Sequence, residues 1–183
     1  MNRKKILVII DCQNDFITGA LRNDEAIKKV PNIVKRINEF NGDAILYTMD
    51  THTPSYMATK EGQKLPFIHC VKGTQGWEIE SSVMEAIDEA KNRGINVVRI
   101  EKPTFGSFRL PEEIRRVVRG SEVDIEFVGF CTDICVVSNA LMTKAAYYSK
   151  GNIKVVEDCC AGVTPESHEA ALTTMKMCQI DVI

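Results

Sequence analysis

A junction between a strand and a helix decides the fold, and it reads Val128-Gly129-Phe130-Cys131-Thr132-Asp133-Ile134-Cys135-Val136-Val137. The mostly apolar run at 125–128 is typical of a buried strand, and apolar residues at helical spacing follow over 134–148. Thr132 or Asp133 is placed to cap this helix with a side-chain oxygen. We therefore expect the thiol of Cys135 in the first turn of a helix, at the carboxyl end of a strand.

Cys135 is a candidate nucleophile because of this position. Unpaired amides and the positive end of the helix dipole both favour a thiolate in the first turn of a helix. The same amides can hold a negatively charged oxygen in a transition state. The alternative interpretation is a buried structural cysteine, and a lone cysteine more often has that role. The rest of the chain has to decide between the two.

The composition is that of an ordinary globular protein of 183 residues with a formal net charge of −2. Lys and Arg are scattered among acids, which argues against nucleic-acid binding, and no apolar run is long enough to span a membrane. The first apolar run is short and ends at Asp11, so we expect a strand and not a signal peptide. Seven cysteines form no disulfide framework, so free thiols in the cytoplasm fit best.

Strand and helix patterns alternate along the chain. We expect strands at 6–10, 44–49, 96–100, 125–128, 153–156 and 180–183, and helices at 24–40, 81–93, 111–119, 134–148 and 165–177. This order predicts an α/β fold, a three-layer α/β/α sandwich with a central, mainly parallel six-stranded sheet, in a single domain over residues 1–183. The Pro- and Gly-containing segment 50–76 is expected to be a functional loop with short helical pieces.

Chemically active side chains follow several of these strands, where a parallel sheet binds its ligands. Asp11 follows the first strand, Lys102 the third and Cys135 the fourth. Asp11 could accept the thiol proton, while the Lys102 cation would hold Asp11 in place and favour the thiolate. None of the three histidines is placed to act as the base, so Asp11, Lys102 and Cys135 form the more economical triad.

The segment after the second strand suggests a metal site. Asp50 and His52 lie on the same side of an extended stretch, and His69 comes later in the same loop. One carboxylate and two imidazoles can hold a divalent metal with open positions for water or substrate. The alternative is that both histidines hydrogen-bond to loop backbone. His168, in the last long helix, is expected at the surface, and the remaining cysteines, such as Cys178, are expected to be buried apolar residues.

Together these motifs resemble the isochorismatase-like cysteine hydrolase superfamily and, within it, the nicotinamidases (pyrazinamidases). The resemblance covers nearly the whole chain and rests on Asp11-Cys12-Gln13-Asn14-Asp15-Phe16, Asp50-Thr51-His52, His69-Cys70-Val71-Lys72-Gly73-Thr74-Gln75-Gly76, Lys102, and Gly129-Phe130-Cys131-Thr132-Asp133-Ile134-Cys135-Val136. It implies the triad Asp11, Lys102 and Cys135. It also implies a cis peptide at Phe130–Cys131 that aims the amides of Cys131 and Cys135 at the oxyanion.

The resemblance further implies zinc, manganese or iron held by Asp50, His52 and His69, and no organic cofactor. Phe16 falls where the family has an aromatic wall of the substrate pocket. The family commonly forms dimers or tetramers, so a homo-oligomer is one expectation, and its partners are small-molecule substrates. The expected reaction is release of ammonia from a small (hetero)aromatic carboxamide such as nicotinamide, through a thioester.

The chain departs from nicotinamidases in its substrate pocket. Pro66 stands where an aromatic residue is usual, and Thr51, Cys131 and Ile134 also differ from the common residues. The missing wall would have to come from Phe67, Phe105 or Phe108. The alternatives are a hydrolase of carbamoyl or ureido compounds, a hydrolase of an enol ether such as isochorismate, and a non-enzymatic binding module. Cys135 argues against the enol ether, whose hydrolysis uses no cysteine nucleophile.

Overall fold

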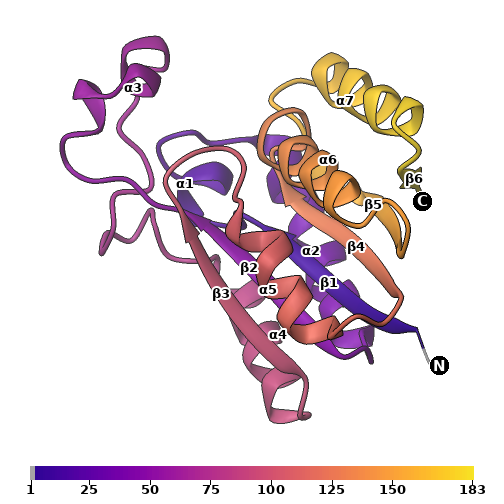
Figure 1. The fold of residues 1–183 in the computed structure, drawn as a ribbon. Helices are drawn as coiled ribbons and strands as arrows, with labels where there is room; N and C mark the ends of the chain where they lie inside the picture. Colours follow the sequence, from indigo (N-terminus) through magenta and orange to yellow (C-terminus); the bar gives the residue numbers. More distant parts are fainter. Residues whose placement is uncertain (1–2) are drawn as a thin grey trace.

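The computed structural model describes residues 3–183 and has a six-stranded sheet at its centre (Figure 1). The strand order is β3-β2-β1-β4-β5-β6, and every neighbouring pair is parallel. The strands are β1 (Lys4–Ile10), β2 (Ala44–Asp50), β3 (Asn96–Lys102), β4 (Val123–Phe130), β5 (Gly151–Ala161) and β6 (Asp181–Val182). The predicted α/β fold is thus confirmed.

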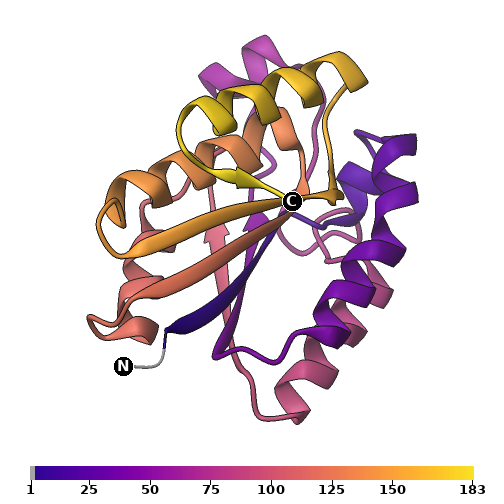
Figure 2. The same ribbon diagram turned by 90° about the vertical axis from the view of Figure 1, so that its right-hand side faces the viewer.

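Helices cover both faces of the sheet, as the edge-on view in Figure 2 shows. The helices are α1 (Asn14–Ile17), α2 (Asp24–Glu39), α3 (Lys60–Lys64), α4 (Ser81–Asn92), α5 (Arg109–Val118), α6 (Val137–Ala146) and α7 (Pro165–Met177), with a 3-10 turn η1 (Tyr56–Ala58) and a π-helical turn η2 (Thr132–Val136). The α2 and α4 helices pack on one face, and α5, α6 and α7 on the other. None of the helices in residues 3–183 is long and apolar enough to cross a membrane.

The position of β1, with a hydrophobic core on each face of the sheet, explains why its sequence is continuously apolar. Leu7 and Ile9 belong to the core beneath α2 and α4, whereas Ile6, Val8 and Ile10 belong to the core beneath α5, α6 and α7. Because side chains alternate along a strand and both faces are covered, every position in 6–10 needs an apolar residue. All five of these side chains are fully buried.

The carboxyl end of β4 approaches β1 unusually closely. Gly129 has φ +116°, and a Cβ there would lie 2.1 Å from the Ile10 carbonyl oxygen. Only glycine tolerates both this backbone conformation and this contact. The β4–β5 register also shifts between Phe127 and Gly129, and β5 continues to Ala161, five residues beyond its predicted end at 156.

The nucleophile helix starts differently from the prediction. Residues 132–136 form the π-helical turn η2, in which the Val136 amide donates to the Cys131 carbonyl at 3.0 Å, and the α-helix begins only at Val137. Neither Thr132 nor Asp133 caps it; the cap residue of η2 is Cys131, without a side-chain cap hydrogen bond. The predicted cap was wrong because Asp133 accepts from the Val163 amide in the segment after β5, and Thr132 is hydrogen-bonded to His168 in α7.

Residues 51–80 form the long irregular segment, in which η1 and α3 are the short helical pieces. Figure 1 shows α3 projecting away from the sheet, above the carboxyl ends of the strands. Two isolated bridges tie the segment down: His52 pairs with Val71, and Gln13 pairs with Ile79. All seven cysteines are free thiols, and Cys178 is exposed where burial was expected.

Candidate active site

Asp11, Lys102 and Cys135 meet in one buried group, hereafter the nucleophile cluster. Lys102 Nζ lies 2.7 Å from Asp11 Oδ2 and donates to the Cys135 sulfur at 3.6 Å. All three side chains are buried, and Lys102 Nζ also donates to the Thr104 carbonyl at 2.9 Å. The structure therefore brings together the three predicted members of the triad.

The strands position this cluster. Asp11 directly follows β1 and adopts φ +46°, with its amide and Oδ1 both hydrogen-bonded to Thr48 on β2, at 3.2 and 2.7 Å. Lys102 is the last residue of β3 and pairs with Asp50, the last residue of β2. Because the strands are parallel and in register, their carboxyl ends deliver these groups to one edge of the sheet.

Burial opposes a free thiolate in this cluster. It raises the pKa of the Cys135 thiol well above the ordinary value, and although the Lys102 ammonium lowers that pKa, the Asp11 and Asp50 charges raise it again. Burial thus acts against the thiolate that the position of Cys135 near the start of a helix favours. Burial lowers the pKa of Lys102, but the charges of Asp11, Cys135 and Asp50 outweigh it and leave that pKa raised, so the ammonium stays charged. Burial also raises the pKa of Asp11, whose carboxylate contacts the same ammonium.

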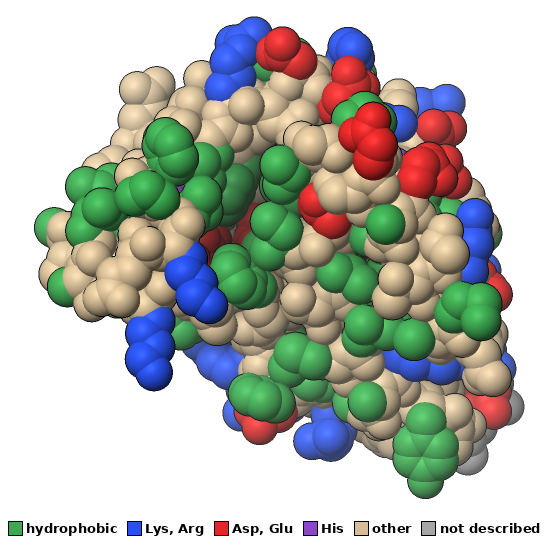
Figure 3. All heavy atoms as spheres, turned by 90° about the horizontal axis from the view of Figure 1, so that it is seen from above, with side chains coloured by type: hydrophobic (Ala, Val, Ile, Leu, Met, Phe, Trp, Pro, Cys, Tyr) green, Lys and Arg blue, Asp and Glu red, His purple; other side chains and the backbone are tan. Residues whose placement is uncertain are grey.

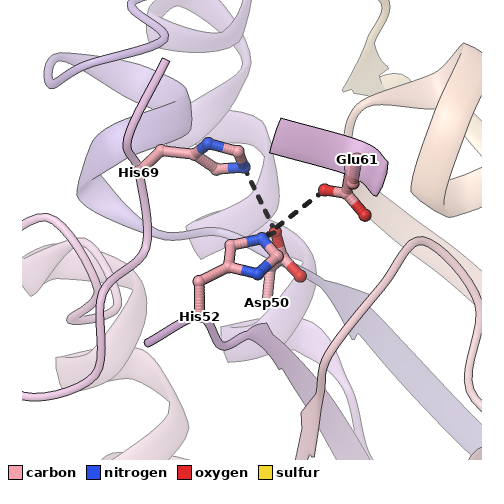
Figure 4. Close-up of side chains that lie close together, drawn as sticks. All are labelled: Asp50, His52, Glu61 and His69. Atoms are coloured by element: carbon pink, nitrogen blue, oxygen red, sulfur yellow. Dashed lines mark hydrogen bonds and ion pairs between the residues drawn. The ribbon is translucent and has the colours of Figure 1, made fainter. Parts of the chain in front are cut away.

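A second group of side chains, hereafter the His/carboxylate cluster, lies next to the nucleophile cluster (Figure 4). Its members are Asp50, His52, Glu61 and His69. Asp50 Oδ2 lies 2.9 Å from His52 Nε2 and 3.5 Å from His69 Nε2, and Glu61 Oε1 lies 3.6 Å from His52 Nε2. One nitrogen or oxygen from each residue falls within 4.8 Å of the others. The three predicted ligands are thus brought together, with Glu61 as a fourth that the sequence analysis missed.

This cluster fits a divalent metal ion. Two imidazoles and two carboxylates are a suitable donor set for zinc, manganese or iron. Asp50 Oδ1 is buried and has no hydrogen-bond partner among the described residues, although Lys102 Nζ lies 3.6 Å away. His69 Nδ1 contacts the Phe67 carbonyl at 2.7 Å, which orients the ring with Nε2 toward Asp50, as in metal-binding histidines.

Asp50 and His69 each shift the other's pKa in this cluster. Burial raises the pKa of Asp50, but hydrogen bonds with His52 and His69 and the Lys102 charge outweigh it, so that pKa is lowered. Burial lowers the pKa of His69, yet its contact with Asp50 raises it overall. The cluster therefore presents ionised carboxylate to a cation.

Two side chains after β1 hold the long segment against the sheet. Gln13 Oε1 accepts from the Asp50 amide at 2.7 Å, and its amide group donates to the Asp50 and Trp77 carbonyls at 2.8 Å each. Asp15 Oδ2 accepts from the Cys70 amide at 2.7 Å, beside His69. The motif at 11–16 thus supplies both a member of the nucleophile cluster and the anchors of the His/carboxylate cluster.

Both clusters open into a cavity of about 640 Å³, visible as the hollow in Figure 3. Cys135, Asp50 and His69 line it together with the predicted substrate-binding residues Phe16, Phe67 and Phe105. Phe16 packs edge-on against His69, with ring centroids 5.7 Å apart. Phe108 is 83% exposed and does not line the cavity, so it does not supply the missing aromatic wall.

Two residues that follow β5 bond to the nucleophile turn from outside: Val163, in the segment 162–164 that joins β5 to α7, and His168, in α7. The Val163 amide donates to both oxygens of Asp133, at 3.1 and 3.2 Å. His168 Nδ1 is hydrogen-bonded to Thr132 Oγ1 at 2.8 Å, and Thr132 is fully buried. His168 is therefore half-buried and not the surface residue expected from its helix, because Thr132 comes from a distant part of the chain.

The turn also contains the cis peptide that the resemblance implies, at Phe130–Cys131. The Cys131 carbonyl accepts from the amides of Ile134 and Val136, which flank Cys135 in the sequence. A thiol, a carboxylate and a buried ammonium beside a cavity are groups with which acyl transfer through sulfur can be carried out.

The isochorismatase domain family matches residues 5–183 of the chain. A curated relative from Bacillus subtilis (strain 168), described as the uncharacterized isochorismatase family protein PncA, is 29% identical over 177 residues, and 93% of each protein is covered. A crystal structure of nicotinamidase/pyrazinamidase PncA from Bacillus subtilis has a TM-score of 0.82 at 29% identity over 98% of both chains. Pyrazinamidase of Pyrococcus horikoshii in complex with zinc has a TM-score of 0.77 at 26% identity, also over 98% of both chains.

Proposed function

The chain belongs to the isochorismatase family, and on that premise we propose that it is an amidohydrolase that uses Cys135 to release ammonia from a small heteroaromatic carboxamide such as nicotinamide. The observation that carries this proposal is the contact of Lys102 Nζ with both Asp11 (2.7 Å) and the Cys135 sulfur (3.6 Å) beside an open cavity. The similarity to nicotinamidase and pyrazinamidase structures at 26–29% identity supports the choice of substrate.

The first half of the reaction forms a thioester. Asp11 takes the proton of the Cys135 thiol as the sulfur attacks the carboxamide carbon, which forms the C–S bond and moves the carbonyl electron pair onto oxygen. The amides of Cys131 and Cys135 stabilise this oxyanion. When the oxyanion collapses, the C–N bond breaks and the nitrogen takes the proton from Asp11, so ammonia leaves and the acyl group stays on sulfur.

The second half hydrolyses the thioester. Asp11, again ionised, takes a proton from water as the water oxygen attacks the acyl carbon. The C–S bond then breaks, the carboxylic acid leaves, and the proton returns to the sulfur. Lys102 holds Asp11 in place throughout and favours its return to the ionised form after each proton transfer, because its buried ammonium contacts both the carboxylate and the sulfur.

Asp50, His52, Glu61 and His69 would hold a zinc, manganese or iron ion in this enzyme. When bound, such an ion supplies a Lewis-acidic centre for a ring nitrogen or a water molecule. Phe16 provides the apolar wall against which a ring can pack, since it lines the cavity beside His69. These residues orient the substrate, whereas Cys135 forms the covalent bond to it and Asp11 transfers the protons.

The test is an ammonia-release assay over nicotinamide, pyrazinamide, benzamide and small ureido and carbamoyl compounds, with and without a chelator. We expect turnover of the heteroaromatic amides and its loss in Cys135→Ala, while Cys178→Ala, at an exposed thiol, retains activity. Preference for ureido compounds would move the assignment to that class of C–N hydrolase. Full activity in Cys135→Ala would refute the mechanism.

A further inference from the structure

The cavity has two chemically different ends. Its inner end is formed by buried groups, namely Cys135, Asp50 and His69. Its outer walls carry apolar side chains that remain open to solvent: Phe67 is 56% exposed, Phe105 42% and Val163 58%. Figure 3 shows hydrophobic side chains gathered around the hollow, with acidic groups inside it.

The size of the cavity exceeds what a bare pyridine carboxamide fills. Pockets of about 300–1,000 Å³ enclose drug-sized ligands, and this cavity of about 640 Å³ lies within that range. A single ring with one amide group that reached Cys135 would occupy the inner end. The exposed walls would then stay in contact with water, which is unfavourable for so much apolar surface beside a binding site.

The charge around the cavity restricts what can fill the outer part. Arg22 is the one Arg or Lys among the described residues that line it, and its guanidinium already pairs with Asp24 at 2.9 Å. The lining also includes the carboxylates of Asp24, Glu25 and Asp50. Asp24 pairs with Arg22, and Glu25 pairs with Lys28 at 2.6 Å. A negatively charged group would therefore find no unpaired Lys or Arg among the described lining residues, whereas a neutral apolar group would cover the Phe67 and Phe105 rings.

We propose that the substrate of this site is a neutral carboxamide that carries an apolar substituent, which lies against Phe67, Phe105 and Val163 while the amide reaches Cys135. This inference rests on the proposed amidohydrolase function and narrows its substrate class. Phe67, which follows Pro66 in the sequence, presents an open aromatic face on the outer wall of the same cavity that Cys135 lines at its inner end.

The experiment compares kcat/KM for three primary amides. They are nicotinamide, the same amide with a phenyl group on the ring carbon meta to both the amide and the ring nitrogen, and the analogue with a carboxylate at that carbon. We expect the phenyl compound to exceed nicotinamide by at least about tenfold, since it buries an additional apolar ring. The carboxylate compound is expected to fall below nicotinamide.

Variants then locate the effect. Phe67→Ala and Phe105→Ala should each reduce the ratio of phenyl-compound to nicotinamide kcat/KM by at least about threefold. Phe108→Ala is the matched control, because Phe108 is 83% exposed and outside the cavity, and it should leave that ratio unchanged. Calorimetric binding of the three amides to Cys135→Ala gives the same ranking without turnover, and thermal denaturation checks that each variant is folded.

The possible outcomes distinguish a failure of this inference from a failure of the proposed amidohydrolase function. Fast hydrolysis of nicotinamide together with equal or weaker hydrolysis and binding of the phenyl compound would overturn the inference and leave the amidohydrolase intact. A preference for the phenyl compound that survives both Phe→Ala changes would also overturn it. If no amide is hydrolysed or bound, the proposed function fails and this inference fails with it.

Discussion

Two of the three members of the nucleophile cluster lie at the ends of strands, and Cys135 lies in the turn that follows β4, whereas three of the four members of the His/carboxylate cluster lie outside the sheet. Asp11 directly follows β1, and Lys102 is the last residue of β3. Asp50 is the last residue of β2, the strand that lies between β1 and β3. His52, Glu61 and His69 all come from the irregular segment 51–80. Strand register fixes the first group, while the second depends on a few side-chain anchors, chiefly Gln13 and Asp15.

The two clusters also differ in charge balance. In the nucleophile cluster the Lys102 ammonium faces Asp11 directly, so its charges are compensated within the protein. The His/carboxylate cluster has two carboxylates and two imidazoles, and Asp50 keeps a buried oxygen without a hydrogen-bond partner among the described residues. Asp50 connects the two, since its Oδ1 lies 3.6 Å from Lys102 Nζ. Substitutions in the nucleophile cluster should therefore affect stability, and substitutions in the His/carboxylate cluster should affect metal binding.

Lys102→Met should have the largest effect. It leaves the Asp11 carboxylate buried without its cation, which we expect to destabilise the fold by about 3–5 kcal/mol and to lower kcat by more than about 100-fold. Lys102 lowers the pKa of Cys135, so its loss raises that pKa and slows alkylation of Cys135 by iodoacetamide at a fixed pH. Urea denaturation, ammonia release and peptide mass spectrometry measure the three effects.

Lys72→Met is the matched control, because Lys72 is an exposed lysine paired with Glu101. An exposed ion pair contributes only about 0–1 kcal/mol. Equal losses of stability in Lys102→Met and Lys72→Met would contradict the expectation that the buried lysine contributes more to stability than the exposed one.

His69→Ala should remove metal binding while leaving the nucleophile cluster in place. We expect about one metal ion per chain in the purified wild-type protein and a large loss of metal in the variant, by elemental analysis. His168→Ala, which changes the histidine in α7, should keep its metal. A full complement of metal in His69→Ala would show that the ion is held elsewhere.

Asp15→Asn tests the anchor of the long segment. It weakens the charge-assisted hydrogen bond to the Cys70 amide, next to His69, so metal affinity should fall by about 10–100-fold. Metal competition with a chromogenic chelator measures this change. Asp158→Asn is the control at an exposed aspartate, and it should bind metal as the wild type does.

The contact between His168 and Thr132 should give the smallest effect. Thr132→Val and His168→Ala each remove one hydrogen bond to the nucleophile turn, so we expect kcat to fall by about 2–10-fold with little change in KM. Because they remove the same bond, the double variant should be no worse than either single one. Thr132→Ser keeps the hydroxyl and should retain activity; losses that multiply in the double variant would argue against a shared role.

The same comparison explains how far the sequence could predict this site. Asp11, Lys102 and Cys135 follow recognisable strands, and parallel strands end at one edge, so their meeting could be expected before any coordinates were known. Glu61 could not be found this way, because it is one acid in a charged, irregular stretch whose path has no periodic pattern. Its position depends on η1 and α3, which bring Glu61 Oε1 to 3.6 Å from His52 Nε2.

The nucleophile turn was mispredicted for a related reason. The apolar spacing after Ile134 correctly indicates a helix, but not that the first turn is π-helical or that Thr132 and Asp133 bond outward. Those bonds come from residues about 30 positions later in the chain. Side-chain contacts between residues so far apart in the chain leave no local pattern in the sequence. Strands do leave one, because their apolar residues form recognisable runs.

A covalent acyl group on Cys135 is the most direct test of the proposed reaction. Rapid acid quenching during turnover of nicotinamide, followed by peptide mass spectrometry, should find the nicotinoyl group on the peptide that contains Cys135, in a thioester that hydroxylamine removes. Ammonia release at full rate with an unmodified Cys135 peptide at every time point, and with the acyl group absent from the rest of the protein, would contradict it.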